Sequence, residues 1–166
     1  ETLEDLRNAR RTMADLLNMP WYKQQVLFGQ EIMIGYSDSA KDAGFLAAAW
    51  AQYQAQEQLA ELFQEHHIPL TLFHGRGGSV SRGGGSTTRM AVLSQPPGSV
   101  AGRIRVTEQG EVIRFKYGQQ QVAMHNLEQY VAATLEATLM PPVKAKPEWR
   151  EEMDRLTAVS YRAYRS

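Results

Sequence analysis

The sequence lacks cysteine, net charge and long apolar runs, and each absence excludes a class of protein. Without cysteine, disulfide scaffolds and thiolate metal sites are excluded. Lysine plus arginine and aspartate plus glutamate each total 18, so the overall charge gives no reason to expect nucleic acid or an anionic membrane as a partner. No apolar stretch approaches the roughly 20 residues of a membrane span. What remains is the composition of an ordinary soluble domain, with 43% hydrophobic and 22% charged residues.

Two short apolar runs on either side of a long helical segment predict a parallel α/β unit. Residues 32–34 (IMI) and 70–73 (LTLF) are largely apolar, as expected of strands buried on both faces. Residues 45–66 contain no proline or glycine and are rich in alanine, glutamine, leucine and glutamate, which favour helix. A strand, a helix and a second parallel strand form a right-handed crossover unit.

The segments outside this unit predict further helices and one ambiguous region. Helices are expected over residues 1–19, 126–140 and 147–166. Pro20 is expected to end the first of them. Residues 103–118 predict either a hairpin or a third strand followed by an irregular loop.

The two most unusual polar segments follow the two predicted strands directly. They are SDSAKD at residues 37–42 and HGRGG at residues 74–78. In parallel α/β folds, functional sites lie just beyond the carboxyl ends of the strands. The predicted architecture therefore places both segments where chemistry is expected.

The SDSAKD segment supports two interpretations from its residues alone. Asp38 and Asp42 are carboxylates of the kind that bind hard metal ions, and Lys41 adds an ammonium group. Alternatively, the segment begins a helix, with Ser39 as the cap and Asp42 favoured by the helix dipole. The two interpretations are compatible with each other.

The segment from Phe73 to Gly85 contains six glycines and two arginines and no acidic residue. Backbone amides and arginines suit a phosphate-binding loop, the Arg-Gly-Gly triplets also match RNA-binding segments, and a plain flexible loop is the third interpretation. No Gly-Lys-Ser/Thr follows, so it is not a Walker loop. His74 at the strand end is either catalytic or a hydrogen-bonded structural residue.

Four segments together resemble one known family. IMIGYSDSAKDAG (32–44), FHGRGGSVSRGG (73–84), LSQPPGS (93–99) and RVTEQGEVIRFKYG (105–118) are similar to phosphoenolpyruvate carboxylase, in the same order. The resemblance implies an internal fragment from the C-terminal half of a larger enzyme. It implies an α/β fold, part of a (βα)₈ TIM-type barrel with additional long helices. Residues 1–122 would supply barrel strands, helices and active-site loops, and residues 123–166 would be appended helices.

The resemblance also implies an activity and roles for individual residues. Members of the family carboxylate phosphoenolpyruvate with bicarbonate to oxaloacetate and phosphate, which feeds the tricarboxylic acid cycle. They use Mg²⁺ or Mn²⁺ and are cytoplasmic, allosteric homotetramers without nucleic acid or membrane partners. The implied metal ligands are Glu1 and Asp38, the catalytic residues are Lys41, His74 and Arg82, and the substrate-binding residues are Arg76, Gly77, Gly78, Ser79, Gly83 and Gly84.

Two departures from the family pattern lie in the glycine-rich segment. Ser81 stands where the family has glycine, and the stretch before Leu93 is one residue longer than usual. One alternative is therefore a degenerate member of the family. The other is a non-catalytic module that binds anions or RNA through its Arg-Gly-Gly triplets.

Overall fold

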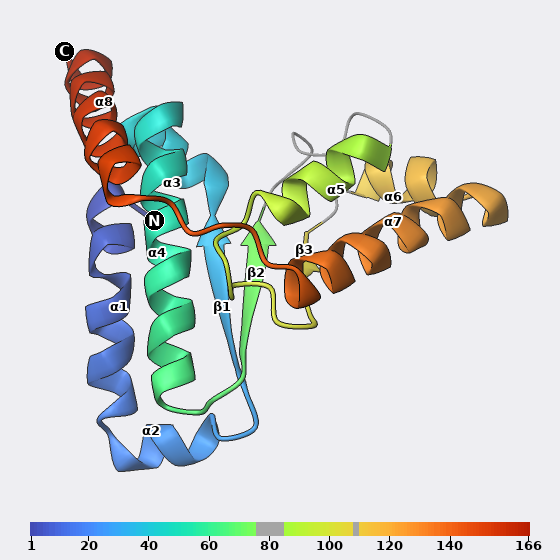
Figure 1. Cartoon of the computed structure of the whole chain (residues 1–166), viewed down its shortest axis with the longest axis horizontal. Coiled ribbons are helices and arrows are strands. Elements are labelled where there is room, and N and C mark those ends of the chain that lie inside the picture. Colours follow the sequence, from blue (N-terminus) through green and yellow to red (C-terminus); the bar gives the residue numbers. More distant parts are fainter. Residues whose placement is uncertain (76–84, 108–109) are drawn as a thin grey trace.

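The computed structural model describes residues 1–75, 85–107 and 110–166 (Figure 1). Its elements follow in the order α1 (Leu3–Leu17), α2 (Pro20–Gln25), β1 (Gln30–Gly35), α3 (Tyr36–Ala43), α4 (Phe45–Glu65), β2 (Leu70–Gly75), α5 (Gly85–Leu93), β3 (Arg105–Val106), α6 (Gly110–Tyr117), α7 (Gln120–Leu139) and α8 (Pro147–Arg165).

The three strands form one parallel sheet in the order β1-β2-β3. Ile34 pairs with His74 and Gly35 with Gly75, while Phe73 pairs with Arg105. The predicted strand–helix–strand unit is confirmed, with α4 as the crossover. Of the two interpretations of residues 103–118, the third strand is confirmed and the hairpin is wrong. The structure is a helix-rich α/β fold.

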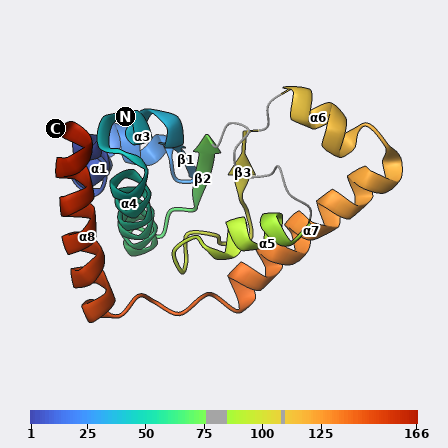
Figure 2. The ribbon, with the colours of Figure 1, turned by 90° about the horizontal axis from the view of Figure 1, so that it is seen from above.

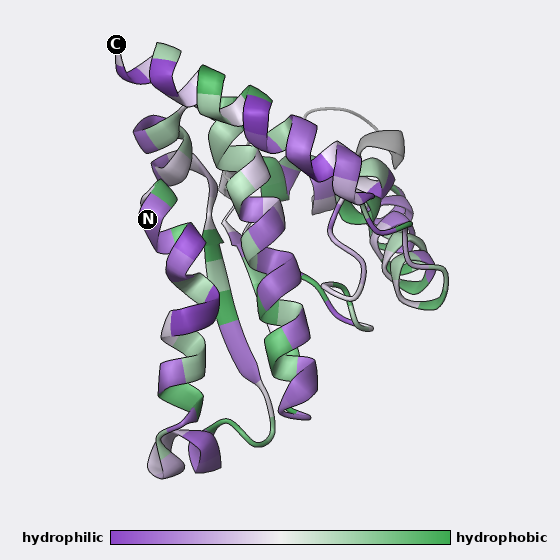
Figure 3. Ribbon diagram, turned by 60° about the vertical axis from the view of Figure 1, so that its left-hand side comes forward, coloured by the Kyte–Doolittle hydropathy of each residue, from purple (hydrophilic) through white to green (hydrophobic). Residues whose placement is uncertain are grey.

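The main core lies between one face of the sheet and the helices α1 and α4, which run side by side along it (Figure 1). Its buried side chains are Leu17, Val26, Ile34, Leu59, Leu62, Phe63, Ile68 and Leu72. Small residues on α4 allow the close approach of α1, because Ala47, Ala51 and Ala55 pack against Leu3 and Leu6. Met33 points to the opposite face of the sheet and is 57% exposed. In Figure 3, β1 changes from hydrophilic to hydrophobic along its length toward its carboxyl end.

A second group of helices lies beyond β3. The helices α5 and α7 pack together around Val92, Val100, Ala133 and Ala137. Figure 2 shows this group on one side of the strands, with α1, α4 and α8 on the other side. The segment after α7 returns the chain to α4, where α8 is held by a salt bridge from Arg150 to Glu57.

Several predicted helix boundaries are corrected by the structure. The first helix ends at Leu17, and Pro20 begins α2 instead of ending α1. The segment expected as an irregular loop contains α6, and α5 was not predicted at all. The helix expected from Asn126 begins at Gln120. Asn126 therefore lies inside the helix and does not cap it, and its side chain donates to the carbonyl of Lys116.

None of the helices in the described ranges is both long enough and apolar enough to span a membrane.

Candidate functional site

The carboxyl end of β1 is built around Gly35, the last residue of the strand. Its amide N–H donates to Glu1 Oε2 across 2.5 Å. A Cβ added at Gly35 would lie 2.6 Å from that oxygen, which is closer than real Cβ atoms approach. A larger residue here would therefore move the Glu1 carboxylate, which is the end of a flexible side chain, out of its present position.

The Glu1 carboxylate carries a raised pKa. The main cause is desolvation of the carboxylate, and the negative charges of Asp5 and Asp38 add to it, while the hydrogen bond from Gly35 opposes it. The Asp38 carboxylate is thus close enough for its charge to act on Glu1. A cation placed near both carboxylates would stabilise their charged forms.

Asp38 lies in the first turn of α3 and is exposed. Carboxylate oxygens are the ligands that Mg²⁺ prefers, and Mg²⁺ commonly uses one or two protein carboxylates together with water and substrate oxygens. The described residues contain no group of three or more His, Asp or Glu side chains that could hold a metal ion. Two carboxylates at the end of β1 are fewer than a closed structural site needs, and they are the number of protein carboxylates that Mg²⁺ commonly uses.

A buried polar network holds α3 against the end of β1. Ser39 is fully buried, and its hydroxyl donates to the carbonyl of Gly35 across 2.6 Å. The Gln52 amide on α4 donates to Ser39 Oγ across 2.7 Å. The prediction that Ser39 caps a helix is wrong, since α3 begins at Tyr36 and Ser39 lies inside it.

Asp42 differs from Asp38 in its role. Its carboxylate accepts a hydrogen bond of 2.9 Å from the backbone N–H of Leu3, at the start of α1. Arg165 lies 3.8 Å from the other oxygen. The prediction that Asp42 is favoured by the dipole of the helix begun by its own segment is wrong, since Asp42 lies in the last turn of α3 and its carboxylate meets the start of α1 instead. Asp42 therefore joins α3 to α1.

Lys41 is exposed on α3, between the two aspartates. Its carbonyl accepts a hydrogen bond of 2.9 Å from the hydroxyl of Tyr164 on α8. Within the described ranges, its ammonium group forms no ion pair. The backbone of Lys41 is thus tied to α8, while its side chain is exposed at the surface.

His74 lies at the end of β2 and is 2% exposed. Its Nδ1 is 2.9 Å from the hydroxyl of Tyr36, the residue that follows β1. Sequence analysis did not identify Tyr36, Gln52 or Gly35 as site residues. The only signal was their position, since Tyr36 and Gly35 stand where β1 ends.

Glu1 and Asp38 lie near the end of β1, Lys41 lies in the last turn of the helix that follows it, and His74 lies on the neighbouring strand. The remaining predicted site residues lie outside the described ranges, and so does the departure at Ser81. They are Arg76, Gly77, Gly78, Ser79, Arg82, Gly83 and Gly84.

Comparison with known proteins supports the same family as the sequence motifs. The family model described as phosphoenolpyruvate carboxylase matches residues 1–166. Phosphoenolpyruvate carboxylase of Alcanivorax borkumensis is 72% identical over 165 residues, which are 99% of this chain and 18% of that protein. The proteins of the same name from Acinetobacter baumannii and Chromohalobacter salexigens are 62% and 60% identical, over the same shares. The chain thus spans 18% of the length of these relatives.

Proposed function

The chain belongs to the phosphoenolpyruvate carboxylase family, and we propose that it acts as one segment of an enzyme that carboxylates phosphoenolpyruvate with bicarbonate. The products are oxaloacetate and phosphate. The observation that carries the proposal is the family match over residues 1–166, with the Glu1 and Asp38 carboxylates at the end of β1 as its structural support.

The fold that we propose for the whole enzyme is a (βα)₈ barrel with additional helices. Three parallel strands in sequential order, with α4 as a crossover, are what a part of such a barrel contains. Residues 1–122 would belong to the barrel and residues 123–166 to the appended helices, so α7 would run from one part into the other.

Apolar side chains exposed on α7 support a larger assembly around this chain. Val131 is 59% exposed and Leu135 is 53% exposed, and both line a cavity of about 440 Å³ beside β3. Contiguous exposed apolar surface marks an interaction site. We propose that further parts of the enzyme cover it.

The metal in this proposal is Mg²⁺ or Mn²⁺, held by Glu1 and Asp38. When bound, it would polarise phosphate and enolate oxygens as a Lewis acid. The chain's own contribution is to present the two carboxylates at the end of β1, with Gly35 leaving room for Glu1.

Lys41, His74 and Arg82 are proposed for the steps on bicarbonate and the enolate. A bicarbonate oxygen attacks phosphorus and the bond from phosphorus to the enol oxygen breaks, which leaves carboxyphosphate and the enolate. Carboxyphosphate then releases CO₂ and phosphate, and C3 of the enolate bonds to CO₂. Lys41 and Arg82 offset the negative charge of these species, and His74 assists the handling of bicarbonate and CO₂.

Substrate binding is proposed for the glycine-rich segment. Arginine recognises phosphate by two parallel hydrogen bonds, and glycines let backbone amides approach it. The residues are Arg76, Gly77, Gly78, Ser79, Gly83 and Gly84. By the same resemblance we propose a cytoplasmic homotetramer.

The experiment places this chain in the full-length Alcanivorax borkumensis relative, in place of the matching 165 residues. We expect the chimera to form oxaloacetate from phosphoenolpyruvate and bicarbonate when Mg²⁺ is present, measured by a coupled dehydrogenase assay. The 166 residues alone are expected to form none. A folded chimera that forms neither phosphate nor oxaloacetate would contradict the proposal, provided that the unmodified relative is active.

A further inference from the structure

Tyr36 and His74 connect the two strand ends from which the candidate site is built. Tyr36 is the first residue of α3, two positions before Asp38, and His74 is the next-to-last residue of β2. The hydroxyl of Tyr36 lies 2.9 Å from His74 Nδ1, and the two rings are 6.1 Å apart at 45°. The pair therefore joins the segment with Asp38 to the strand that leads into the glycine-rich segment.

Packing alone does not fix the chemistry of the His74 ring. His74 is 2% exposed and shares a face of β2 with Leu72, so its ring is closely surrounded. A 180° flip of an imidazole exchanges nitrogen and carbon atoms of nearly equal size, and packing distinguishes the two orientations poorly. A hydrogen bond at Nδ1 distinguishes them, because a carbon in that position would leave the Tyr36 hydroxyl without this partner.

We propose that Tyr36 is a positioning residue that fixes both the orientation and the tautomer of His74. In this proposal the Tyr36 hydroxyl is the donor and Nδ1 is the acceptor, so that the neutral ring carries its proton on Nε2. Nε2–H is then the group through which His74 donates to an oxygen of bicarbonate or of a species derived from it. This inference rests on the proposed function and adds a residue to it.

The first test compares Tyr36→Phe with Tyr22→Phe in the full-length chimera. Both changes remove a phenolic hydroxyl, since the Tyr22 hydroxyl donates to Gln30 Oε1 across 3.0 Å at the opposite end of β1. We expect Tyr36→Phe to lower kcat about 10-fold, with KM for phosphoenolpyruvate changed less than about 2-fold. Tyr22→Phe should leave both constants unchanged. An unchanged kcat in Tyr36→Phe, or an equal fall in both variants, would overturn the proposal.

The second test asks whether Tyr36 acts through His74. A glutamine at position 74 places an N–H donor near the position of Nε2 and has no group at Nδ1, while an asparagine places its amide near Nδ1. We expect His74→Gln to retain more turnover than His74→Asn. We also expect Tyr36→Phe to lower kcat less than about 2-fold in the His74→Gln background, because that variant has no imidazole for Tyr36 to position.

The opposite results would overturn the inference. If Tyr36→Phe costs the same factor in both backgrounds, Tyr36 acts without His74. If His74→Asn is the more active of the two, the Nε2 donor is not what His74 contributes. The proposed function fails separately, since it requires activity of the unsubstituted chimera, while this inference concerns only the ratios among its variants.

Discussion

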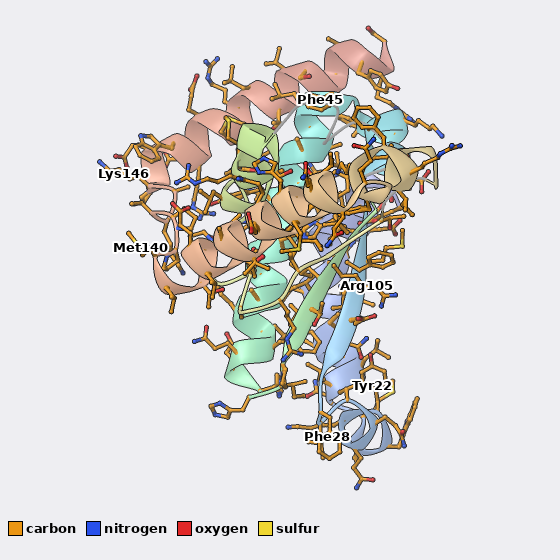
Figure 4. The ribbon with its side chains drawn as sticks, turned by 90° about the vertical axis from the view of Figure 1, so that its right-hand side faces the viewer. Tyr22, Phe28, Phe45, Arg105, Met140 and Lys146 are labelled. Carbon is orange, nitrogen blue, oxygen red and sulfur yellow. The ribbon has the colours of Figure 1, made fainter. Side chains whose placement is uncertain are left out.

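The two ends of the β1–β2 pair are held in different ways. At the amino end, Leu17, Val26 and Ile68 pack an apolar core, and Figure 4 shows Tyr22 and Phe28 together at this end of the molecule, away from Arg105. At the carboxyl end, by contrast, a buried network of Ser39 and Gln52 surrounds the carbonyl of Gly35.

This difference separates stability from chemistry along one pair of strands. Apolar packing tolerates small changes at a moderate cost in stability, since it is not directional. Buried polar groups depend on particular partners and cost more when one is removed. Substitutions that reach the Glu1 and Asp38 carboxylates should therefore change turnover, while substitutions in the buried network or at the amino end should change stability.

The largest effect is expected from Asp38→Asn in the full-length chimera. The change keeps the shape of the side chain and removes the charge of a proposed metal ligand. We expect turnover and Mg²⁺ affinity to fall by more than about 100-fold, because even outer partners of metal ligands contribute about 10- to 100-fold. Steady-state kinetics as a function of Mg²⁺ concentration measures both.

Asp42→Asn is the matched control for Asp38, since both aspartates lie on α3. Asparagine can still accept the hydrogen bond from Leu3, so only the charge beside the start of α1 and Arg165 is lost. A loss of about 0.5 to 1 kcal/mol of stability is expected, with turnover retained. Equal turnover in wild type and Asp38→Asn would show that Asp38 is not a metal ligand and serves only at the start of α3.

Gly35→Ala should have the next largest effect. The added Cβ would meet Glu1 Oε2 at 2.6 Å and displace the carboxylate. A displacement of about 1 Å at a reacting site can reduce turnover about 100-fold, and we expect a fall of about 10- to 100-fold, with a higher Mg²⁺ requirement. The backbone of Gly35 has φ −87°, which alanine adopts readily, so thermal unfolding should change little.

Gly29→Ala, just before the amino end of the same strand, is expected to lower stability and to leave turnover unchanged. Gly29 has φ +139°, which strains any other residue, while its Cβ would meet Pro69 only at ordinary contact distance. We expect a loss of about 1 to 3 kcal/mol in the free energy of unfolding and no change in kcat. If both glycine variants lost turnover equally, the proposed division between the two ends would be wrong.

Ser39→Ala tests the buried network itself. The change removes one donor to the Gly35 carbonyl and leaves the Gln52 amide without its nearer acceptor. We expect unfolding to become easier by about 1 to 3 kcal/mol, measured by denaturant titration. Ser37→Ala, at an exposed position of the same helix, should stay within about 0.5 kcal/mol of wild type. Equal stability of the two variants would mean that the network contributes nothing.

The strands and the crossover helix were predictable because their signals are local. The apolar run at residues 32–34 predicts a strand, and the alanine-rich segment of α4 predicts a helix. Both predictions need only the residues of the segment itself. In contrast, α6 contains Val112, Ile113 and Phe115, which are weak helix formers, and it packs against α7. Its helix depends on a tertiary contact that no local pattern contains.

The polar residue types at the end of β1 could be read from the sequence, but their contacts could not. By residue type alone Asp38 and Asp42 are equivalent, and the fold shows that Asp42 binds the start of α1. The role of Tyr36 could not be predicted from the sequence, because its partner His74 is 38 positions away on the next strand. Pairings of this kind follow from strand register, which sequence periodicity does not supply.

The smallest effect is expected from Tyr22→Phe, which removes one polar contact from the apolar end. The Tyr22 hydroxyl donates to Gln30 Oε1, while the Gln30 amide donates to the carbonyl of Glu31. Both Tyr22 and Gln30 are half-buried, so water can replace the lost partner, and the change should cost about 0.5 to 1 kcal/mol. The melting temperature should fall by a few degrees, measured by calorimetry, and turnover should match wild type. A loss of turnover comparable to that of Tyr36→Phe would show that a phenolic hydroxyl matters equally at both ends, and that the polar contacts at the carboxyl end are not specific to the site.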